Sequence, residues 1–327
     1  MINPDAINTV LQHLLPAIRL HRSKASEPFI LGLSGLQGSG KSTWAEALTV
    51  ALNETPDISA KTLSLDDFYH DHPQLVSLRE ADAENALLRT RGQPGTHDEV
   101  LAQQFFESLA KRQGSEIDLT GAGGRGDTRW PAFDKSLHNG EGGRVPESQW
   151  DTTSYDEPLD VVIFEGWCLG FQSLSPDILE KKWKAAQLYK ADTSSDQPQT
   201  SLSTQTLADH QLRHLLLINE NLERYCQSFM GPDMFDAFVH LDTEQLRNVY
   251  AWRLNQEAAL WKSKGSGMTD EQVIAFVKGY MPAYELYLER LSAGDFFPRA
   301  KDGGLDKIHL RIMLDEQRRI CALQKVP

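Results

Sequence analysis

The chain has 327 residues, with 46 Asp or Glu against 33 Lys or Arg, so its formal net charge at pH 7 is −13. This acidity argues against nucleic acids and anionic membranes as partners, because both are bound through basic faces. Hydrophobic residues make up 40% of the chain, enough for a folded core, and no apolar run approaches the roughly 18 residues of a membrane span. The three cysteines (Cys168, Cys226 and Cys321) are far apart and form no CxxC pair, which indicates free thiols, no structural zinc site and a reducing, cytoplasmic location.

The first 28 residues predict a helical segment that packs on the rest of the protein. Its apolar side chains recur at helical spacing, at Val10, Leu11, Leu14, Leu15 and Ile18. The segment is not rich in Arg or Ser and lacks a short apolar stretch followed by small residues, so we do not interpret it as a targeting peptide.

Residues 29–327 predict one α/β domain. Short apolar runs typical of strands buried on both faces occur at 29–34, 61–65, 161–164, 237–241 and 308–313, and we place the last at an edge of the sheet. Helical patterns follow at 42–52 and 246–260. Strands that alternate with helices predict a doubly wound, mostly parallel sheet with helices on both faces.

Two segments interrupt this alternation. Residues 114–144 are rich in glycine and predict long loops. Residues 191–206, rich in Ser, Thr and Gln, predict a surface insertion without a catalytic role.

The strongest chemical signal is the segment GLQGSGKS at 35–42, between a predicted buried strand and a predicted helix. It matches the pattern G-x-x-x-x-G-K-S, in which glycines let successive N–H groups face phosphate oxygens, the lysine adds a positive charge and the serine hydroxyl can bind Mg²⁺. We therefore expect a site for a nucleoside triphosphate with Mg²⁺. The residues assigned to it are Gly35, Gln37, Gly38, Ser39, Gly40, Lys41, Ser42 and Thr43.

Acidic residues follow two further predicted strands. Asp66 and Asp67 come at the end of the strand at 61–65, and Glu165 follows the strand at 161–164. Open α/β sheets bind their ligands at the carboxyl ends of strands. A carboxylate there can orient or deprotonate a substrate hydroxyl, and Glu165 can organise Mg²⁺, although such acids can also cap a helix or face solvent.

Six motifs spread over residues 29–288 carry a family resemblance. They are GLQGSGKS at 35–42, SLDDFY at 64–69, RGQPGTHD at 91–98, FDKS at 133–136, FEGWCLG at 164–170, and GMTDEQV at 267–273 followed by YMPAY at 280–284. Together they resemble the D-glycerate 3-kinase family, which includes plant glycerate kinases and fungal ATP-binding relatives. That family is similar to the uridine kinases and phosphoribulokinases.

The resemblance implies a P-loop NTPase fold and phosphoryl transfer from ATP to D-glycerate, giving 3-phosphoglycerate. It implies that Asp66 is the catalytic base and that Glu165 and Ser42 hold Mg²⁺. A helical lid at about 243–290 would bring Arg253 to the phosphates, with Arg247 as the alternative.

A small anionic acceptor needs fixed cations and hydrogen-bond donors. The candidates in the motif-bearing loops are Asp67, Tyr69, Arg91, His97, Asp98, Lys135 and Arg144. The chain reads GEGGR at 140–144, where the family pattern has an additional aspartate. Two alternatives therefore stay open: a related kinase acting on another hydroxyl compound, such as a nucleoside or pantothenate, and an ATP-binding regulator without kinase activity.

Overall fold

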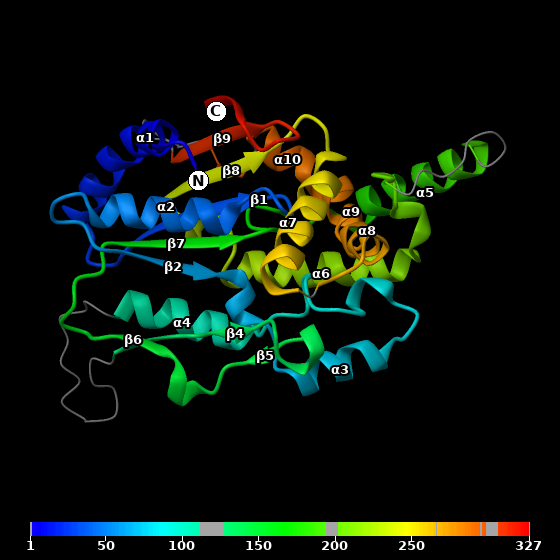
Figure 1. The fold of residues 1–327 in the computed structure, drawn as a ribbon, viewed down its shortest axis with the longest axis horizontal. Helices are drawn as coiled ribbons and strands as arrows, with labels where there is room; N and C mark the ends of the chain where they lie inside the picture. The colour runs from blue at the N-terminus through cyan, green and yellow to red at the C-terminus, as the bar shows by residue number, and fades with distance from the viewer. Residues whose placement is uncertain are drawn as a thin grey trace.

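A six-stranded sheet forms the centre of the computed structural model, which describes residues 2–111, 127–193, 202–265, 267–294, 296–298 and 307–326. The strands are β1 (Phe29–Gly35), β2 (Ala60–Ser64), β7 (Val161–Gly166), β8 (Ala237–Asp242), β9 (Ile308–Leu314) and β10 (Ile320–Val326). Their order is β10-β9-β8-β1-β7-β2 (Figure 1). All neighbouring pairs are parallel except β9 with β10.

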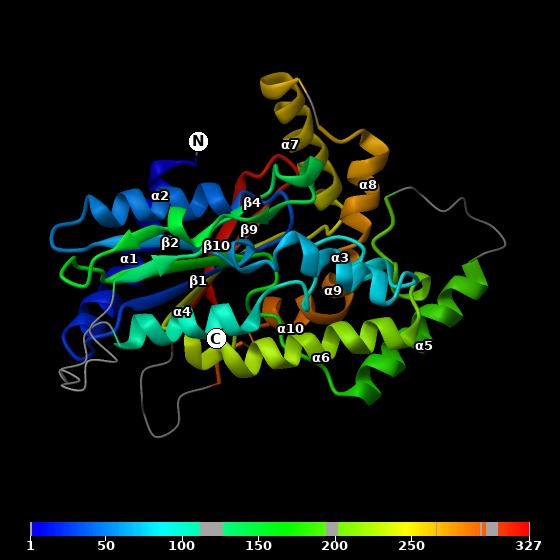
Figure 2. The same cartoon turned by 90° about the horizontal axis from the view of Figure 1, so that it is seen from below.

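Helices cover both faces of this sheet. The α-helices that precede β8 in the described residues are α1 (Pro4–Arg22), α2 (Lys41–Asn53), α3 (His72–Ala81), α4 (Glu99–Lys111), α5 (Pro176–Thr193) and α6 (Leu212–Ser228). Figure 2 shows α2 on one face of the sheet and α4 and α6 on the other. The helix α5 projects away from the body of the molecule. The predicted doubly wound, mostly parallel α/β fold is confirmed.

A helical group lies beyond the carboxyl ends of the parallel strands (Figure 1). It comprises α7 (Asn248–Lys264), α8 (Asp270–Lys278), α9 (Met281–Ala283), a π-helical turn (Tyr284–Leu288) and α10 (Glu289–Ser292). Short 3₁₀ turns occur at Leu65–Phe68, Ala86–Leu88, His138–Gly140, Glu147–Gln149, Leu207–Asp209 and Pro232–Met234. The helical group from α7 to α10 lies beyond the carboxyl ends of the strands, where the sequence motifs are located.

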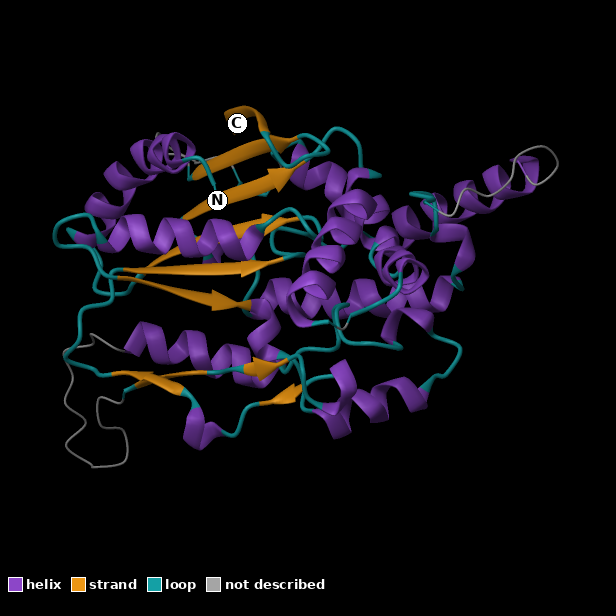
Figure 3. Ribbon diagram, in the orientation of Figure 1, coloured by secondary structure: helices purple, strands orange, loops and turns teal. Residues whose placement is uncertain are grey.

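Two small antiparallel ribbons lie outside the main sheet (Figure 3). They pair β3 (Thr128–Trp130) with β6 (Asp151–Thr153), and β4 (Phe133–Asp134) with β5 (Gly143–Arg144). The described part of the predicted loop region, residues 127–144, therefore contains three short strands that were not predicted. Trp130 and Phe133 are buried there, so these short strands have a core to pack on. Residues 114–126 and 194–201 of the two predicted interruptions lie outside the described residues.

The core explains why the strands read as continuous apolar runs. Every residue of β7 and β8 is buried, as expected for strands covered by helices on both faces. Gly32 in β1 lets aromatic rings close over the strand, because a β-carbon there would lie 2.4 Å from the Phe238 ring. The amphipathic N-terminal helix is also observed, and of its five predicted core positions only Leu15 is partly exposed.

The run at 308–313 forms a strand, but not at the edge of the sheet as predicted. The edge position belongs to β10, which pairs antiparallel with β9. The side chains of β10 are mostly exposed, although its sequence, ICALQKV, begins with four apolar residues. Within the described residues, no helix combines the length and apolarity needed to cross a bilayer.

Two buried histidines lie on neighbouring strands, His240 on β8 and His309 on β9. His309 is 2% exposed and His240 is 1% exposed. Among the described residues, the two ring nitrogens of His309 and the Nδ1 of His240 have no hydrogen-bond partner. Burial lowers the pKa of His309 to about 3 and that of His240 to about 4. Both rings are therefore neutral in the folded protein at neutral pH.

These histidines predict acid-sensitive stability. Each regains an ordinary pKa near 6.5 on unfolding, so the unfolded chain takes up protons below that pH and folding is progressively disfavoured. We expect His309→Leu to remove about 1 kcal/mol of the stability lost between pH 7.5 and 5.5, measured by urea unfolding. The exposed His13→Leu is the matched control and should leave the pH dependence as in the wild type. An unchanged pH dependence in His309→Leu would contradict this account.

Candidate functional site

The glycine-rich loop between β1 and α2 forms a cradle at the amino end of a helix. Gly38 and Gly40 have φ angles of +79° and +94°, a conformation that favours glycine, and Gly40 is the N-cap of α2. Ser39 is buried and its N–H closes a turn onto the Leu36 carbonyl at 3.1 Å. Free N–H groups at a helix amino end bind anions, so this geometry suits phosphate.

Lys41, the first residue of α2, is influenced by the charges of two carboxylates. Its Nζ lies 3.4 Å from the Leu36 carbonyl oxygen. Burial lowers the pKa of Lys41, while the negative charges of Glu165 and Asp66 oppose that shift. Lys41 is therefore influenced by the charges of two predicted site residues, Glu165 in β7 and Asp66 after β2.

Glu165 joins the glycine-rich loop to the end of β2. It is 6% exposed, and its Oε1 accepts hydrogen bonds from the Ser42 hydroxyl at 3.0 Å and from the Ser64 hydroxyl at 3.1 Å. A hydroxyl and a carboxylate are oxygen donors of the kind that Mg²⁺ prefers. The described residues contain no cluster of three His, Cys, Asp or Glu side chains that would hold a metal unaided. The donor set therefore fits a Mg²⁺ ion whose remaining ligands are phosphate and water.

Asp66 projects from the 3₁₀ turn that follows β2, and its carboxylate pairs with Lys135. The Lys135 Nζ lies 2.5 Å from Asp66 Oδ2. Burial alone would raise the pKa of Asp66, but the charge and hydrogen bond of Lys135, with a hydrogen bond from Tyr69, hold it below the ordinary value. Asp66 is thus ionised at neutral pH, and its side chain is 27% exposed.

Asp67, unlike Asp66, contacts the backbone of its own turn. Its Oδ2 accepts the Ser64 N–H at 3.1 Å and completes a capping box for the turn Leu65–Phe68. Burial raises the pKa of Asp67 to about 6. The structure thus shows a capping contact for this residue, and its substrate role stays a prediction.

Aromatic rings form a wall beside Asp66. The rings of Tyr69 and His97 stack with their centroids 4.3 Å apart. His97 Nδ1 lies 3.1 Å from the Tyr225 hydroxyl, whereas its buried Nε2 has no hydrogen-bond partner within the part of the chain that the structure describes. Burial lowers the pKa of His97 to about 3, so its ring is neutral and offers one unused nitrogen.

Arg144 and Asp98 form a hydrogen-bonded pair that contacts the backbone of Tyr69. An Arg144 Nη2 donates to the Tyr69 carbonyl at 3.1 Å and to Asp98 Oδ2 at 2.9 Å. Asp98 Oδ1 also accepts the Leu101 N–H at 3.0 Å, at the start of α4. Both residues were predicted to bind substrate, and the structure shows them making protein contacts.

Arg91 uses part of its guanidinium on neighbouring backbone. Its Nη1 donates to the carbonyls of Gly140 and Glu141 at 2.8 and 2.5 Å, and its guanidinium lies 5.5 Å from the Phe133 ring centre. Its Nε and Nη2 make no hydrogen bond to any described residue. Arg91 therefore keeps donors for a ligand.

Arg253 lies on α7 next to the glycine-rich loop. A β-carbon at Gly38 would meet the Trp252 side chain at 2.9 Å and the Arg253 backbone N at 3.1 Å, so the loop and helix touch at this glycine. The Arg253 guanidinium pairs with Glu257 at 3.1 Å. Arg247 is exposed at the start of α7. The contact at Gly38 makes Arg253 the better placed of the two arginines.

The two tyrosines of the motif YMPAY, Tyr280 and Tyr284, face the site, although the sequence alone assigned no role to them. The Tyr284 hydroxyl, on the π-helical turn, accepts the Gln37 N–H of the glycine-rich loop at 3.0 Å. Tyr280 is buried against Trp167, with ring centres 4.7 Å apart. Burial and the Asp66 charge raise the pKa of Tyr280, and Arg91 and Arg253 oppose that shift. The four-residue spacing of the two tyrosines on a predicted helix was the available signal.

The remaining loop residues complete the cradle. Gly35 is close-packed, because a β-carbon there would lie 2.7 Å from Ser39 Oγ, and Thr43 is exposed in the first turn of α2. The site therefore combines the predicted residues of the glycine-rich loop with three side chains from other elements: Asp66 in the turn after β2, Glu165 near the carboxyl end of β7, and Lys135 in the loop after β4.

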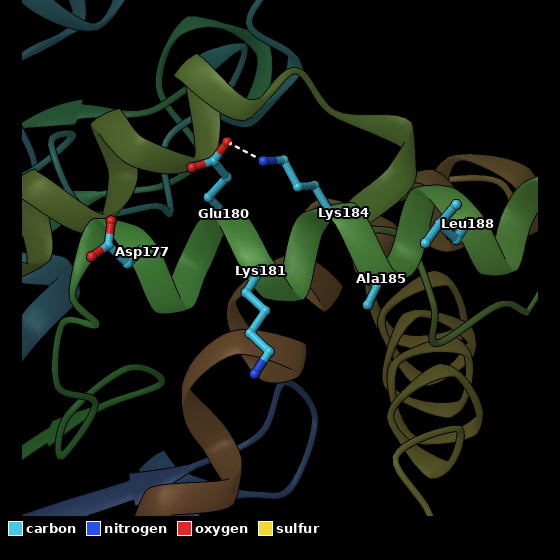
Figure 4. A pocket seen from close by; sticks show the side chains of 6 residues that line it. All are labelled: Asp177, Glu180, Lys181, Lys184, Ala185 and Leu188. Atoms are coloured by element: carbon cyan, nitrogen blue, oxygen red, sulfur yellow. Dashed lines mark ion pairs between the residues drawn. The ribbon is translucent and has the colours of Figure 1, made fainter.

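A surface hollow on α5 is unrelated to this site. It has a volume of about 440 Å³ and is lined by Asp177, Glu180, Lys181, Lys184, Ala185 and Leu188 (Figure 4). All six belong to one helix, and Glu180 pairs with Lys184 at 2.7 Å across one turn. A single exposed helix face brings no groups together from different elements.

Comparisons with known proteins show which proteins the chain resembles. No protein-family model matches the chain. It is 33% identical to the uncharacterized kinase mug58 of Schizosaccharomyces pombe, over 96% of this chain and 98% of that protein. It is 34% identical to the chloroplastic D-glycerate 3-kinase of Arabidopsis thaliana over 92% of this chain, which spans 57% of that enzyme's length.

A solved structure of D-glycerate 3-kinase from Cryptococcus neoformans aligns with 99% of this chain and 100% of its own, at 30% identity and a TM-score of 0.80. The predicted fold class and family resemblance are confirmed. The chain therefore belongs to the family of ATP-dependent P-loop kinases that includes D-glycerate 3-kinase.

Proposed function

We propose that this kinase transfers the γ-phosphoryl group of ATP to the primary hydroxyl of D-glycerate, giving 3-phosphoglycerate and ADP. The observation that carries the proposal is the ion pair of Asp66 with Lys135, which lies beside Lys41 and Glu165 at the carboxyl ends of the strands. This arrangement offers a carboxylate to a hydroxyl and cations to anionic groups on both reactants. The D-glycerate 3-kinases named above support the choice of acceptor.

On the donor side, the glycine-rich loop and Lys41 bind the triphosphate. The backbone N–H groups around Gly38 and Gly40 and the dipole of α2 attract the phosphate oxygens. Lys41 adds its charge to the transferred group, in a position already matched to two carboxylates. Phosphoryl transfer is accelerated mainly by positioning and charge neutralisation, so these contacts supply much of the catalysis.

Ser42 and Glu165 are the residues that would hold Mg²⁺. The ion supplies neutralisation of phosphate charge when bound. The Ser42 hydroxyl donates to Glu165 at 3.0 Å, and the Ser64 hydroxyl at the end of β2 donates to the same carboxylate oxygen.

Asp66 orients the acceptor hydroxyl and takes its proton. Its lowered pKa keeps the carboxylate ionised, which suits acceptance of a hydrogen bond more than strong base catalysis. That is sufficient here, because a loose phosphoryl-transfer transition state places little demand on deprotonation before the phosphorus–oxygen bond forms.

The acceptor carboxylate binds beside the aromatic wall. Lys135 is 56% exposed next to Asp66, and Arg91 keeps free donors close by. The unpartnered Nε2 of His97 and the hydroxyl of Tyr280 complete a set of groups for the carboxylate and the 2-hydroxyl of glycerate. In this proposal Arg144 and Asp98 position Tyr69 and do not touch the substrate.

The helical group from α7 to α10 acts as the lid. Arg253 leaves Glu257 for the phosphates when ATP is bound, which excludes water and limits ATP hydrolysis. The close approach of Trp252 and the Arg253 backbone to Gly38 places α7 against the glycine-rich loop.

Acceptor-dependent ADP release tests the proposed substrate. We expect turnover with D-glycerate to exceed turnover with glycerol by about 100-fold in kcat/KM, because glycerol lacks the carboxylate and leaves charged groups unpaired. L-glycerate, uridine and pantothenate complete the panel. Faster turnover with uridine or pantothenate would contradict D-glycerate as the acceptor, and no acceptor-dependent release with the panel would favour a regulatory role.

Asp66→Asn tests the role of the carboxylate. We expect kcat to fall by roughly 100- to 10,000-fold while ATP binding is retained, because the amide cannot take the hydroxyl proton. Asp151→Asn is a matched control, since Asp151 makes an ion pair of the same 2.5 Å length with Lys61 away from the site. Its turnover should equal that of the wild type. Near-wild-type kcat in Asp66→Asn would show that Asp66 does not act on the acceptor.

A further inference from the structure

The turn between β9 and β10 has an arginine where its backbone favours glycine. The Arg318 N–H donates to the Asp315 carbonyl at 2.9 Å, and the Asp315 N–H donates to the Arg319 carbonyl at 3.0 Å. The φ angle of Arg318 is +62°, in the left-handed region. Three-residue hairpin loops of this kind prefer glycine at that position. Arg318 is thus unfavourable for the turn itself, which points to a function for its side chain.

The turn is held rigidly in spite of this residue. The Asp315 carboxylate accepts the N–H groups of Gln317 and Arg319 at 2.9 and 2.8 Å and pairs with the Arg319 side chain at 2.7 Å. The Trp252 indole N–H on α7 donates to the carbonyls of Asp315 and Glu316 at 3.1 and 2.8 Å. The backbone that carries Arg318 is therefore fixed against α7.

Arg318 reaches the glycine-rich loop from this turn. Its Nη1 donates to the Gly38 carbonyl at 3.2 Å. Trp252 packs on the same glycine. Arg318 is exposed and makes no ion pair with a carboxylate of any described residue. An unneutralised guanidinium thus lies at the rim of the phosphate cradle.

The strand order indicates which part of ATP would meet Arg318. Asp66 follows β2 and Glu165 lies at the carboxyl end of β7, both on one side of β1, whereas the turn follows β9, beyond β8 on the other side. The γ-phosphate must face Asp66 to react with the acceptor. The nucleoside therefore leaves the cradle in the opposite direction, toward β8 and β9.

We propose that Arg318 is a nucleotide-binding residue whose planar guanidinium packs on the base of ATP at the rim of the glycine-rich loop. The inference rests on the proposed orientation of the triphosphate, with its γ end at Asp66. A guanidinium stacks well on aromatic rings, and its remaining N–H donors can keep the bond to Gly38. Because Trp252 is fixed to the same turn, base binding is coupled to the position of α7 and of the adjacent Arg253.

Calorimetric titration of the full chain with ATP, ADP and inorganic tripolyphosphate, each with Mg²⁺, tests this role. In Arg318→Gly we expect affinity for ATP and ADP to fall about tenfold, as lost stacking implies, while affinity for tripolyphosphate is unchanged. The melting temperature should stay the same or rise, because glycine suits the left-handed backbone. Arg318→Lys should recover only part of the loss, since it restores the charge without the planar group.

Lys325→Ala is the matched control. It removes a positive charge from the exposed far end of β10 and should bind all three ligands like the wild type. Unchanged ATP affinity in Arg318→Gly would overturn the proposal, and so would an equal loss for ATP and tripolyphosphate, which would place the effect on the phosphates or the loop. A wild-type protein that binds ATP but shows no turnover with D-glycerate would contradict the proposed acceptor and leave the Arg318 result interpretable.

Discussion

Opposite charges that compensate one another at the ends of three parallel strands are the constraint on which the site depends. Lys41 lies among Glu165 and Asp66, and Asp66 is in turn paired with Lys135. The buried Glu165 and the partly buried Lys41 and Asp66 would be costly in isolation, because burial disfavours an uncompensated charge. Together they form a balanced set that a triphosphate and a small anionic acceptor can enter by exchanging partners.

The loops around this set are held mainly by polar contacts to the backbone. Arg91 and Arg144 donate to main-chain carbonyls, and Asp67 caps the turn that presents its neighbour Asp66. Irregular segments cannot satisfy their carbonyls through regular secondary structure, so side chains do so instead. The result is a rigid frame for Asp66 and the Tyr69 ring, which is what positioning catalysis requires.

Sequence patterns predicted the parts of the fold that arise from local rules. The buried strands were recognisable because both of their faces are apolar, and the glycine-rich loop because its positive φ angles at Gly38 and Gly40 restrict the residues allowed there. β10 was not predicted, although its sequence, ICALQKV, contains four consecutive apolar residues, and its place at the edge of the sheet depends on pairing with β9 in the folded chain. The short ribbons near Phe133 depend on partners that are brought together only in the folded chain.

The sequence indicated which residues would lie at the site better than it indicated what each of them contacts. Asp66, Lys135 and Glu165 follow from motifs and do converge, whereas Arg144 and Asp98 look equally suited to substrate binding in the sequence but contact each other. Arg318 carries no sequence signal, because its proximity to Gly38 spans 280 positions of the chain. Such roles depend on which backbone groups the tertiary fold leaves for each side chain to satisfy.

The most direct measurement is a crystal structure of the protein with Mg²⁺, a non-hydrolysable ATP analogue and D-glycerate. The account predicts that the primary hydroxyl of glycerate lies within hydrogen-bond distance of the Asp66 carboxylate and in line with the γ-phosphate held at Lys41. A complex in which Asp66 keeps Lys135 as its partner, and another group contacts that hydroxyl, would contradict it.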